Sequence, residues 1–409
     1  MRISGAKNAA LPLMCASLLS REPLTLSNIP DLADIKTLLK VLAELGITNT
    51  SSISDDGDKS IILKPEGEIN TTAPYDMVRT MRASILVLGP LVARYGHAKV
   101  SLPGGCAIGN RPIDLHIKGI EALGATIELE DGYVVANAPN GLTGARIRIP
   151  MVSVGATENI LMAATLAKGT STIENAAREP EITNLAMCLN AMGASITGMG
   201  TDTLVVNGVA ELHQANIAVI ADRIEAGSYA IAGAMTKGTL ELTNIDPSIM
   251  SATISALQEI GVNITVGENS LTISDHDKPL KGINIQTQPY PGFATDMQAQ
   301  LMTLMTITEG ASVITENIFE NRFMHVPELS RMGADITTST NVATIRGVKM
   351  LHGAEVMATD LRASMSLVLA ALAAEGETTI HRVYHLDRGY EKLEEKLNSV
   401  GADVKRGKE

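Results

Sequence analysis

The stretch Leu123-Gly124-Ala125-Thr126-Ile127-Glu128-Leu129, followed by Asp131-Gly132 and Tyr133-Val134-Val135-Ala136, decides the fold of this 409-residue chain. A glycine that ends a helical pattern and opens an alternating strand is typical of a left-handed helix terminus. The same phrase occurs six times. Its glycines, spaced 78, 69, 68, 72 and 68 residues apart, are Gly46, Gly124, Gly193, Gly261, Gly333 and Gly401. The chain therefore contains six copies of one structural unit.

A second phrase marks another helix in each unit. It ends an apolar helix and precedes a strand, as Lys168-Gly169, Lys237-Gly238, Glu309-Gly310 and Glu375-Gly376. Tyr95-Gly96 takes this place in the second unit and Glu22-Pro23 in the first. We predict an α/β fold of α+β repeats, with three βαβαββ-like repeats in each of two domains. The predicted domains are residues 7–220, and residues 1–6 together with 221–409.

The composition indicates a globular protein and excludes several functions. Hydrophobic residues make up 45% and charged residues 19% of the chain, so a sizeable core is expected. The net charge of −12 argues against general binding to nucleic acids or anionic membranes. Apolar runs such as 363–374 are shorter than the roughly 18 residues that span a bilayer. We expect a cytoplasmic protein.

The three cysteines form no disulfide framework, and no Cys or His spacing resembles a metal site. Cys15 and Cys188 lie in apolar helical patterns and are expected in the core. Cys106 is different, because it lies in a glycine-rich loop five residues before Arg111. A nearby cation lowers a thiol pKa, so Cys106 is a candidate acid or nucleophile. The alternative is a small apolar residue in an ordinary loop.

Unusual polar residues gather at the predicted starts of the apolar helices. They include Lys7-Asn8, Arg82, Ser153, Asp296 and Arg362. A cation in a first turn opposes the helix dipole, whereas an anionic ligand there would use both charges. The pattern favours an anion-binding site, and the alternative is a set of solvated first turns.

Several motifs closely resemble the enolpyruvyl transferase family, in particular its members that act on UDP-N-acetylglucosamine. The resemblance covers nearly the whole chain. Its most specific motifs are SGAKNAALP from Ser4, LPGGCAIGNRPIDLH from Leu102, SVGAT from Ser153, TDMQAQ from Thr295, ENRFMHVPELSRMGA from Glu320, DLRAS from Asp360 and DRGYE from Asp387. The shikimate-pathway members are a weaker match, because they lack the cysteine loop and carry an NAGTAMRP motif that is missing here.

The resemblance implies two three-repeat domains with buried helices and outer sheets, an inside-out barrel whose active site lies between the domains. It implies transfer of the enolpyruvyl group of phosphoenolpyruvate to the 3-hydroxyl of UDP-N-acetylglucosamine, with release of phosphate through a tetrahedral intermediate. This is the first committed step of bacterial peptidoglycan synthesis. The resemblance implies small-molecule substrates, no cofactor, no metal and a monomer, with a possible pyruvate adduct on Cys106.

The resemblance also assigns site residues by motif. The catalytic residues are Cys106, which protonates the methylene carbon, Asp296, which takes the sugar hydroxyl proton, Lys7 and Arg388. The residues that bind phosphoenolpyruvate are Lys7, Asn8, Arg111, Arg322, Arg362 and Arg388. The residues that bind UDP-N-acetylglucosamine are Arg82, Arg111, Pro112, Ile113, Asp114, Leu115, Met151, Val152, Ser153, Val154, Gly155, Asp296 and Ile318.

Other motif residues admit two interpretations. Glu320, Asp360 and His385 either contact a substrate or only orient an arginine. Arg223 and Glu225 either line the uridine pocket or pair with each other. Arg178 fits a structural role better.

Two positions depart from the family pattern. Met151 stands where the family commonly has a lysine, so we expect weaker binding of the nucleotide sugar. Family members usually begin about fifteen residues earlier, with a strand that completes the second domain. We expect either a misassigned start or reduced stability from an unfilled strand position.

Two alternatives come from other classes of protein. A regulatory protein could bind the UDP-sugar without catalysis, although every residue assigned to the chemistry is present. A scaffold would explain the repeats, but it would not explain arginines gathered around a thiol.

Overall fold

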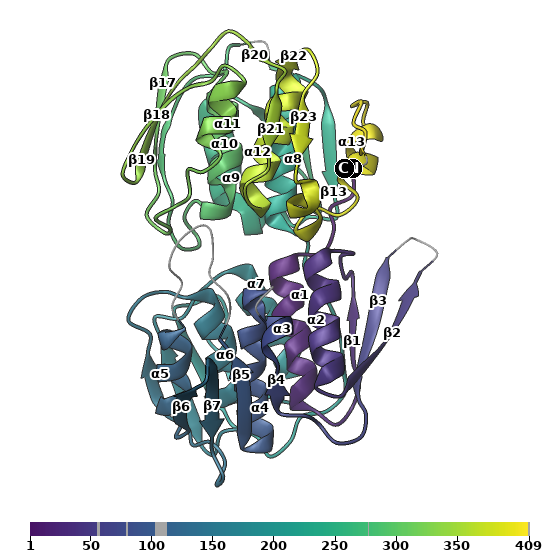
Figure 1. The fold of residues 1–409 in the computed structure, drawn as a ribbon, viewed down its shortest axis with the longest axis vertical. Helices are drawn as coiled ribbons and strands as arrows, with labels where there is room; N and C mark the ends of the chain where they lie inside the picture. Colours follow the sequence, from purple (N-terminus) through teal and green to yellow (C-terminus); the bar gives the residue numbers. More distant parts are fainter. Residues whose placement is uncertain (55–57, 79–80, 103–112, 277, 408–409) are drawn as a thin grey trace. The chain divides into compact units, whose positions relative to one another are not determined.

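The computed structural model describes residues 1–409 except 55–57, 79–80, 103–112, 277 and 408–409 (Figure 1). Three predicted site residues, Cys106, Arg111 and Pro112, lie outside the described residues. The chain divides into two compact units. The described residues of 5–220 form one, the N-terminal unit, whereas Met1–Ser4 and Ala221–Glu409 form the other, the C-terminal unit.

The N-terminal unit contains three repeats. The first consists of α1 (Lys7–Ala16), η1 (Ser17–Leu19), β1 (Leu24–Ser27), α2 (Ala33–Glu44), β2 (Ile47–Ile53) and β3 (Lys59–Pro65). The second consists of β4 (Thr72–Ala73), α3 (Tyr75–Val78), η2 (Arg82–Val87), α4 (Leu88–Tyr95), β5 (His97–Ser101), α5 (Asp114–Ala122), β6 (Thr126–Glu130) and β7 (Tyr133–Asn137). The third consists of β8 (Arg146–Arg148), α6 (Val154–Ala164), β9 (Thr170–Glu174), α7 (Pro180–Ala191), β10 (Ser195–Thr197) and β11 (Thr203–Asn207).

Each repeat of the N-terminal unit has a four-stranded sheet. The strand orders are β12-β1-β3-β2, β4-β5-β7-β6 and β10-β11-β9-β8. In every sheet a short strand runs parallel to a neighbour, and the remaining pairs are antiparallel. The parallel strand of the first sheet is β12 (Ala215–Ala218), which pairs Ala215 with Leu24. The last strand of the unit therefore completes its first sheet.

The C-terminal unit repeats this plan with shorter sheets. Its first repeat contains α8 (Arg223–Met235), β13 (Leu240–Thr243), η3 (Pro247–Met250), α9 (Ser251–Ile260), β14 (Asn263–Val266) and β15 (Ser270–Ser274). The second contains β16 (Asn284–Gln286), η4 (Thr295–Met297), α10 (Gln298–Met305), β17 (Ala311–Thr315), α11 (Val326–Arg331), β18 (Asp335–Ser339) and β19 (Val342–Arg346). The third contains β20 (Leu351–His352), β21 (Glu355–Met357), α12 (Leu361–Ala373), β22 (Ala374–Glu375), β23 (Thr379–His381), η5 (Val383–Arg388) and α13 (Leu393–Asn398).

The sheets of the C-terminal unit differ in size. One sheet has four strands in the order β16-β17-β19-β18, and another has three in the order β13-β15-β14. Strands β20 and β22 form a parallel pair, as do β21 and β23. The start of the chain lies beside β13, where the Ile3 amide donates to the Thr243 carbonyl at 2.9 Å. The predicted hairpin after the repeat glycine is present in five repeats. After Gly401, the described residues form no strand.

The six repeat glycines confirm the predicted helix ends. All six have φ between +93° and +109°, a region that side-chain-bearing residues rarely adopt. In the second phrase, the glycine also has a positive φ at Gly96, Gly169, Gly310 and Gly376. In the fourth repeat, however, Lys237 takes the left-handed conformation, with φ +54°.

The helices of each unit form its core and the strands lie outside them. All eight residues of α10 are buried, as are twelve of the thirteen in α8. Strands such as β15 alternate between buried and half-buried residues, because only one face packs on the helices. In Figure 1, β17, β18 and β19 lie outside α10 and α11. This arrangement confirms the predicted α/β repeats.

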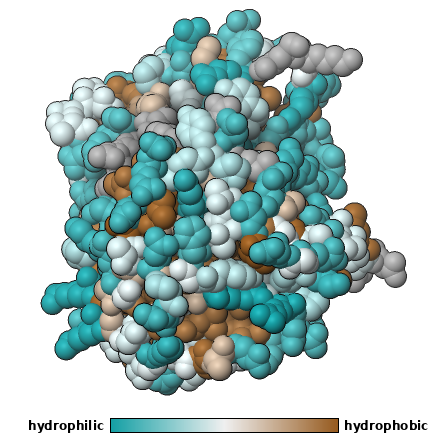
Figure 2. Space-filling view, turned by 60° about the horizontal axis from the view of Figure 1, so that its bottom comes forward, coloured by the Kyte–Doolittle hydropathy of each residue, from teal (hydrophilic) through white to brown (hydrophobic). Residues whose placement is uncertain are grey.

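The surface carries no large hydrophobic area on the face that Figure 2 shows. Hydrophilic residues cover most of it and hydrophobic residues form separate small areas. In the described part of the chain, no helix combines the length and apolar character needed to cross a membrane.

Candidate active site

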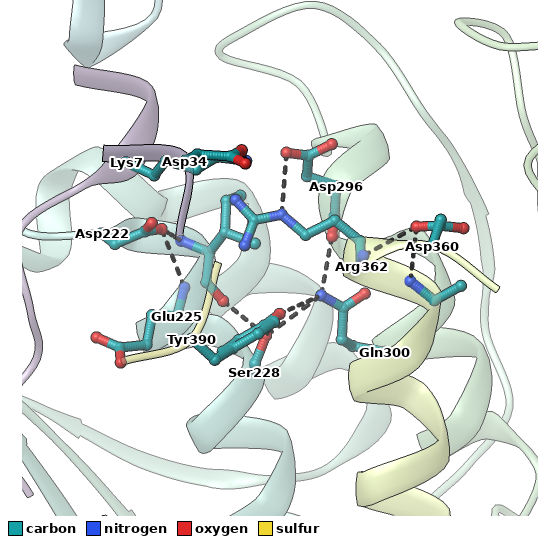
Figure 3. A network of polar contacts seen from close by, with 12 residues as sticks. Lys7, Asp34, Asp222, Glu225, Ser228, Asp296, Gln300, Asp360, Arg362 and Tyr390 are labelled. Carbon is teal, nitrogen blue, oxygen red and sulfur yellow. Dashed lines mark hydrogen bonds and ion pairs between the residues drawn. The ribbon is translucent and has the colours of Figure 1, made fainter. Parts of the chain in front are cut away.

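A charged cluster of the C-terminal unit surrounds Asp296 (Figure 3). Asp296 lies in η4, directly before α10. Its Oδ1 accepts a hydrogen bond from Arg322 Nη2 at 2.9 Å, and its Oδ2 accepts one from Arg362 Nε at 3.2 Å. Both arginines are almost fully buried, whereas the Asp296 side chain is 27% exposed. A carboxylate thus opens to solvent between two buried cations.

Arg362 has N–H donors that are available to a ligand. Burial disfavours its charge, but Asp296, Tyr390 and Asp222 together outweigh this effect and raise the pKa of Arg362. Its Nη1 and Nη2 atoms are buried and make no hydrogen bond with any described residue. Buried guanidinium donors without partners are costly, and an anion satisfies them in a bidentate manner. Arg362 is therefore suited to hold a carboxylate or phosphate.

Two further carboxylates fix the segments that carry these groups. Asp360 caps α12, because its Oδ1 accepts hydrogen bonds from the amides of Arg362 and Ala363 at 2.9 and 3.1 Å. Glu316 is buried and its Oε2 accepts a hydrogen bond from Thr295 Oγ1 at 2.9 Å. Asp360 thus fixes the first turn of the helix that carries Arg362.

Asp222 and Glu225 define the start of α8. Asp222 caps the helix by accepting from the Ile224 amide at 2.8 Å. Glu225 is 1% exposed and pairs with Lys396 Nζ at 2.6 Å, while the Ser4 amide donates to its other oxygen at 2.7 Å. Burial raises the pKa of Glu225 to about 7, although Lys396 opposes this shift. This carboxylate therefore has a structural partner in α13.

Arg388 ends η5 and is half-buried. Its neighbour Asp387 is held by Arg406 at 2.6 Å. Burial, with the nearby charges of Arg382 and Arg388, lowers the pKa of His385. The lowered pKa favours a neutral His385 beside the cations Arg382 and Arg388.

In the N-terminal unit, the predicted cation Lys7 is the first residue of α1. Lys7 is 7% exposed, and its Nζ pairs with Asp34 Oδ2 at 3.2 Å. Asn8 and Arg82 are half-buried, and Arg82 begins η2, which packs against α1 and α6. Three helix starts with polar residues thus belong to one packed group of helices.

The structure brings together two of the predicted nucleotide segments. Residues 113–115 lie at the start of α5 and residues 152–155 at the start of α6, and these two helices pack on each other. A Cβ placed on Gly155 would lie 3.2 Å from His116 Cε1, so a larger residue there would push against the His116 ring. Ser153 caps α6, because its Oγ accepts from the Ala156 amide at 3.3 Å.

The structure describes two further residues that are predicted to contact the nucleotide, Met151 and Ile318. Met151 lies three residues before α6 and is 65% exposed, so its side chain is available to solvent or ligand. The Ile318 amide already donates to Glu316 Oε1 at 2.8 Å. A ligand at Ile318 would therefore meet the carbonyl and side chain.

The sequence patterns missed several polar partners. Asp34, which pairs with Lys7, is an acidic residue in the first turn of α2. Gln300 and Tyr390 lie inside the quoted TDMQAQ and DRGYE motifs, where their positions beside assigned residues were the available signal. Ser228 and Lys396 carried no sequence signal.

The remaining cysteines are core residues as predicted. Cys15 and Cys188 are fully buried, and burial raises the pKa of Cys188 to about 12. Throughout the described residues, no group of three His, Cys, Asp or Glu side chains is arranged to hold a metal ion.

Comparison with solved structures defines the class of this protein. The enolpyruvyl transferase NikO from Streptomyces tendae matches the fold with a TM-score of 0.88 and 27% sequence identity. The match covers 99% of this chain and 95% of that chain. The repeated units, with a carboxylate between buried arginines, are thus those of an enolpyruvyl transferase.

Sequence comparison gives the family. The family model described as EPSP synthase (3-phosphoshikimate 1-carboxyvinyltransferase) matches residues 1–397, and the chain belongs to this family. The UDP-N-acetylglucosamine 1-carboxyvinyltransferase of Zymomonas mobilis is 58% identical over 407 residues, 99% of this chain and 95% of that protein. The protein of the same name from Caulobacter vibrioides is 56% identical over 404 residues, 99% of this chain and 94% of that protein. These matches confirm the family predicted from the motifs.

Proposed function

We infer that this chain transfers the enolpyruvyl group of phosphoenolpyruvate to the 3-hydroxyl of UDP-N-acetylglucosamine and releases phosphate. Relatives more than half identical over nearly the full length carry the name of this activity. The reaction is the first committed step of bacterial peptidoglycan synthesis. The enzyme would act in the cytoplasm as a monomer, on two small-molecule substrates and without a cofactor.

One observation carries the chemical part of this proposal. Asp296 is a partly exposed carboxylate between two buried arginines, and the Nη atoms of Arg362 have no partner among the described residues. A carboxylate that accepts a proton and adjacent donors that hold an anion are both needed when a hydroxyl attacks phosphoenolpyruvate. The cluster provides both within one unit.

We assign the roles on this basis. Asp296 would take the proton of the sugar 3-hydroxyl as that oxygen bonds to the second carbon of phosphoenolpyruvate. Cys106 would protonate the methylene carbon and would be the site of a pyruvate adduct. In the elimination, the new methyl carbon would return a proton to the Cys106 thiolate, the double bond would re-form, and the bond from the second carbon to the phosphate oxygen would break to release phosphate. Arg322 and Arg362 would hold the anionic groups of the substrate from the C-terminal unit.

The remaining contacts follow from the motif assignments. Lys7, Asn8, Arg111 and Arg388 would bind phosphoenolpyruvate, and Lys7 would exchange part of its pairing with Asp34 for the ligand. The sugar nucleotide would lie along residues 111–115 and 151–155, with Arg82, Asp296 and Ile318 as further contacts.

The decisive experiment measures phosphate release with both substrates, with each omitted in turn, and with shikimate 3-phosphate in place of the nucleotide sugar. The wild type should release phosphate only with phosphoenolpyruvate and UDP-N-acetylglucosamine together. Asp296→Ala should lower kcat by at least about 10²-fold, because a positioned general base contributes about 10²–10⁴-fold. The matched control is Asp335→Asn, because Asp335 is an exposed carboxylate that pairs with Arg346. This variant should keep full activity.

Other outcomes would refute the proposal. Binding of UDP-N-acetylglucosamine without any phosphate release would identify a regulatory protein. Phosphate release with shikimate 3-phosphate alone as acceptor would identify the shikimate-pathway activity. Full activity in Asp296→Ala would remove the assigned base.

A further inference from the structure

Tyr390 lies at the centre of a buried polar network in the C-terminal unit (Figure 3). Tyr390 is 2% exposed, and its hydroxyl is 2.9 Å from Ser228 Oγ. The Nε2 atom of the fully buried Gln300 donates to the same hydroxyl at 3.2 Å. Ser228 belongs to α8 and Gln300 to α10, so one phenol joins two central helices.

The number of hydrogens that each group can donate determines which group is the donor in each of these hydrogen bonds. Ser228 donates its single hydroxyl hydrogen to the Ile224 carbonyl at 2.7 Å, so Tyr390 must donate to Ser228. Gln300 Nε2 donates one hydrogen to the Asp296 carbonyl at 2.9 Å. Its second hydrogen is shared between Tyr390 and Ser228, each at 3.2 Å. The phenol hydroxyl thus orients the amide that holds the backbone of Asp296.

The ring of Tyr390 has a separate contact. The guanidinium carbon of Arg362 lies 5.6 Å from the ring centroid, within the range of a cation–π interaction. Arg362 also donates through Nε to Asp296 Oδ2 at 3.2 Å. The same side chain therefore supports Arg362 with its ring and the Asp296 turn with its hydroxyl.

We propose that Tyr390 is a positioning residue for the enolpyruvyl transfer, because its hydroxyl sets the Asp296 turn through Gln300. This inference rests on the proposed function and deepens it. The carboxylate of Asp296 must face the attacking hydroxyl, and small displacements of a reacting group cost much of the rate. Loss of the phenol hydroxyl leaves the Gln300 amide with a weaker orientation, and the turn with a weaker hold.

The two parts of Tyr390 predict a split between kinetic constants. Tyr390→Phe keeps the ring under Arg362 and keeps the contact between Arg362 and Asp296. The KM for phosphoenolpyruvate should therefore change by less than about twofold, whereas kcat should fall about 10-fold. A purely structural tyrosine would lower the melting temperature without this selective effect on kcat.

Gln300→Met tests the same path independently of Tyr390. This variant keeps the side-chain length but removes the bond to the Asp296 carbonyl, so kcat should fall by about 10-fold or more. Tyr390 and Gln300 act as one path, so the double variant should lose little more than Gln300→Met alone. Additive losses in kcat would contradict a shared path.

Tyr229→Phe is the matched control. Tyr229 is fully buried in the same unit, and its hydroxyl makes no hydrogen bond with the described residues. Removing that hydroxyl should leave kcat and both KM values unchanged.

The outcomes separate this inference from the proposed function. A wild type that releases no phosphate overturns both. An active wild type with Tyr390→Phe and Gln300→Met at wild-type kcat overturns this inference alone. If Tyr390→Phe does not fold, a wild-type kcat in Gln300→Met still overturns it, and a selective loss of kcat supports it.

Discussion

Replacing Asp296 by asparagine tests whether its carboxylate holds the two buried arginines in place. The 2.9 and 3.2 Å contacts are each worth about 5 kcal/mol at an effective dielectric constant of about 20, before desolvation is counted. Breaking a buried pair typically costs 3–5 kcal/mol. Since water reaches Asp296, we expect the lower end, about 3 kcal/mol, for Asp296→Asn.

The assay is thermal unfolding of the wild type and Asp296→Asn, with and without saturating inorganic phosphate at constant ionic strength. A loss of about 3 kcal/mol should lower the melting temperature of the C-terminal unit by about 6–12 °C. Phosphate should restore more stability in the variant than in the wild type, because its cations lack their carboxylate. Asp335→Asn, whose exposed pair with Arg346 contributes little, should melt like the wild type.

Two results would refute this reasoning. A melting temperature of Asp296→Asn equal to that of the wild type would mean that the carboxylate does not stabilise Arg322 and Arg362. Equal stabilisation of both proteins by phosphate would mean that the guanidinium groups do not form an anion site.

Two more predictions concern binding and pH. Met151→Lys should lower the KM for UDP-N-acetylglucosamine by up to about fivefold, since an exposed charge contact is worth at most about 1 kcal/mol; an unchanged KM would contradict the assigned contact. The pKa of Glu225 is raised to about 7, so the folded protein holds a proton that the unfolded chain releases. Stability from this group is present below about pH 4.5 and is lost as the pH rises through 7. Relative to the wild type, Glu225→Gln should therefore gain about 3 kcal/mol of unfolding free energy between pH 4.5 and 8, measured from urea unfolding curves. A difference between the two proteins that does not vary with pH would exclude Glu225 as the titrating group.

The local features of the fold were predictable from the sequence, because they depend on neighbouring residues. Gly46 and the five equivalent glycines end helices with positive φ, as the repeated phrase indicates. Lys237 shows the limit of such patterns, since a residue other than glycine adopts the left-handed conformation when its surroundings require it. The pairing of β12 with β1 was not predictable, because parallel strands far apart in sequence carry no local signal of their partner.

The candidate site divides in the same way. The motifs selected Asp296, Arg322 and Arg362, and the structure joins them in one cluster. Tyr390 and Gln300 were not selected, because a buried tyrosine or glutamine reads as a core residue until its hydrogen bonds are known. The assignment of Cys106 remains a prediction, since this residue lies outside the described part of the chain.

The pairing of Ile3 with Thr243 has a consequence for protein synthesis. The segment around Ile3 must wait for some 240 later residues to leave the ribosome before its strand partner exists. The residues of the N-terminal unit end at Ile220, so all of them are synthesised before Thr243. The segment around Ile3 therefore stays without its strand partner until Thr243 has been synthesised, and slowed elongation in this interval would prolong its exposure to proteases and chaperones.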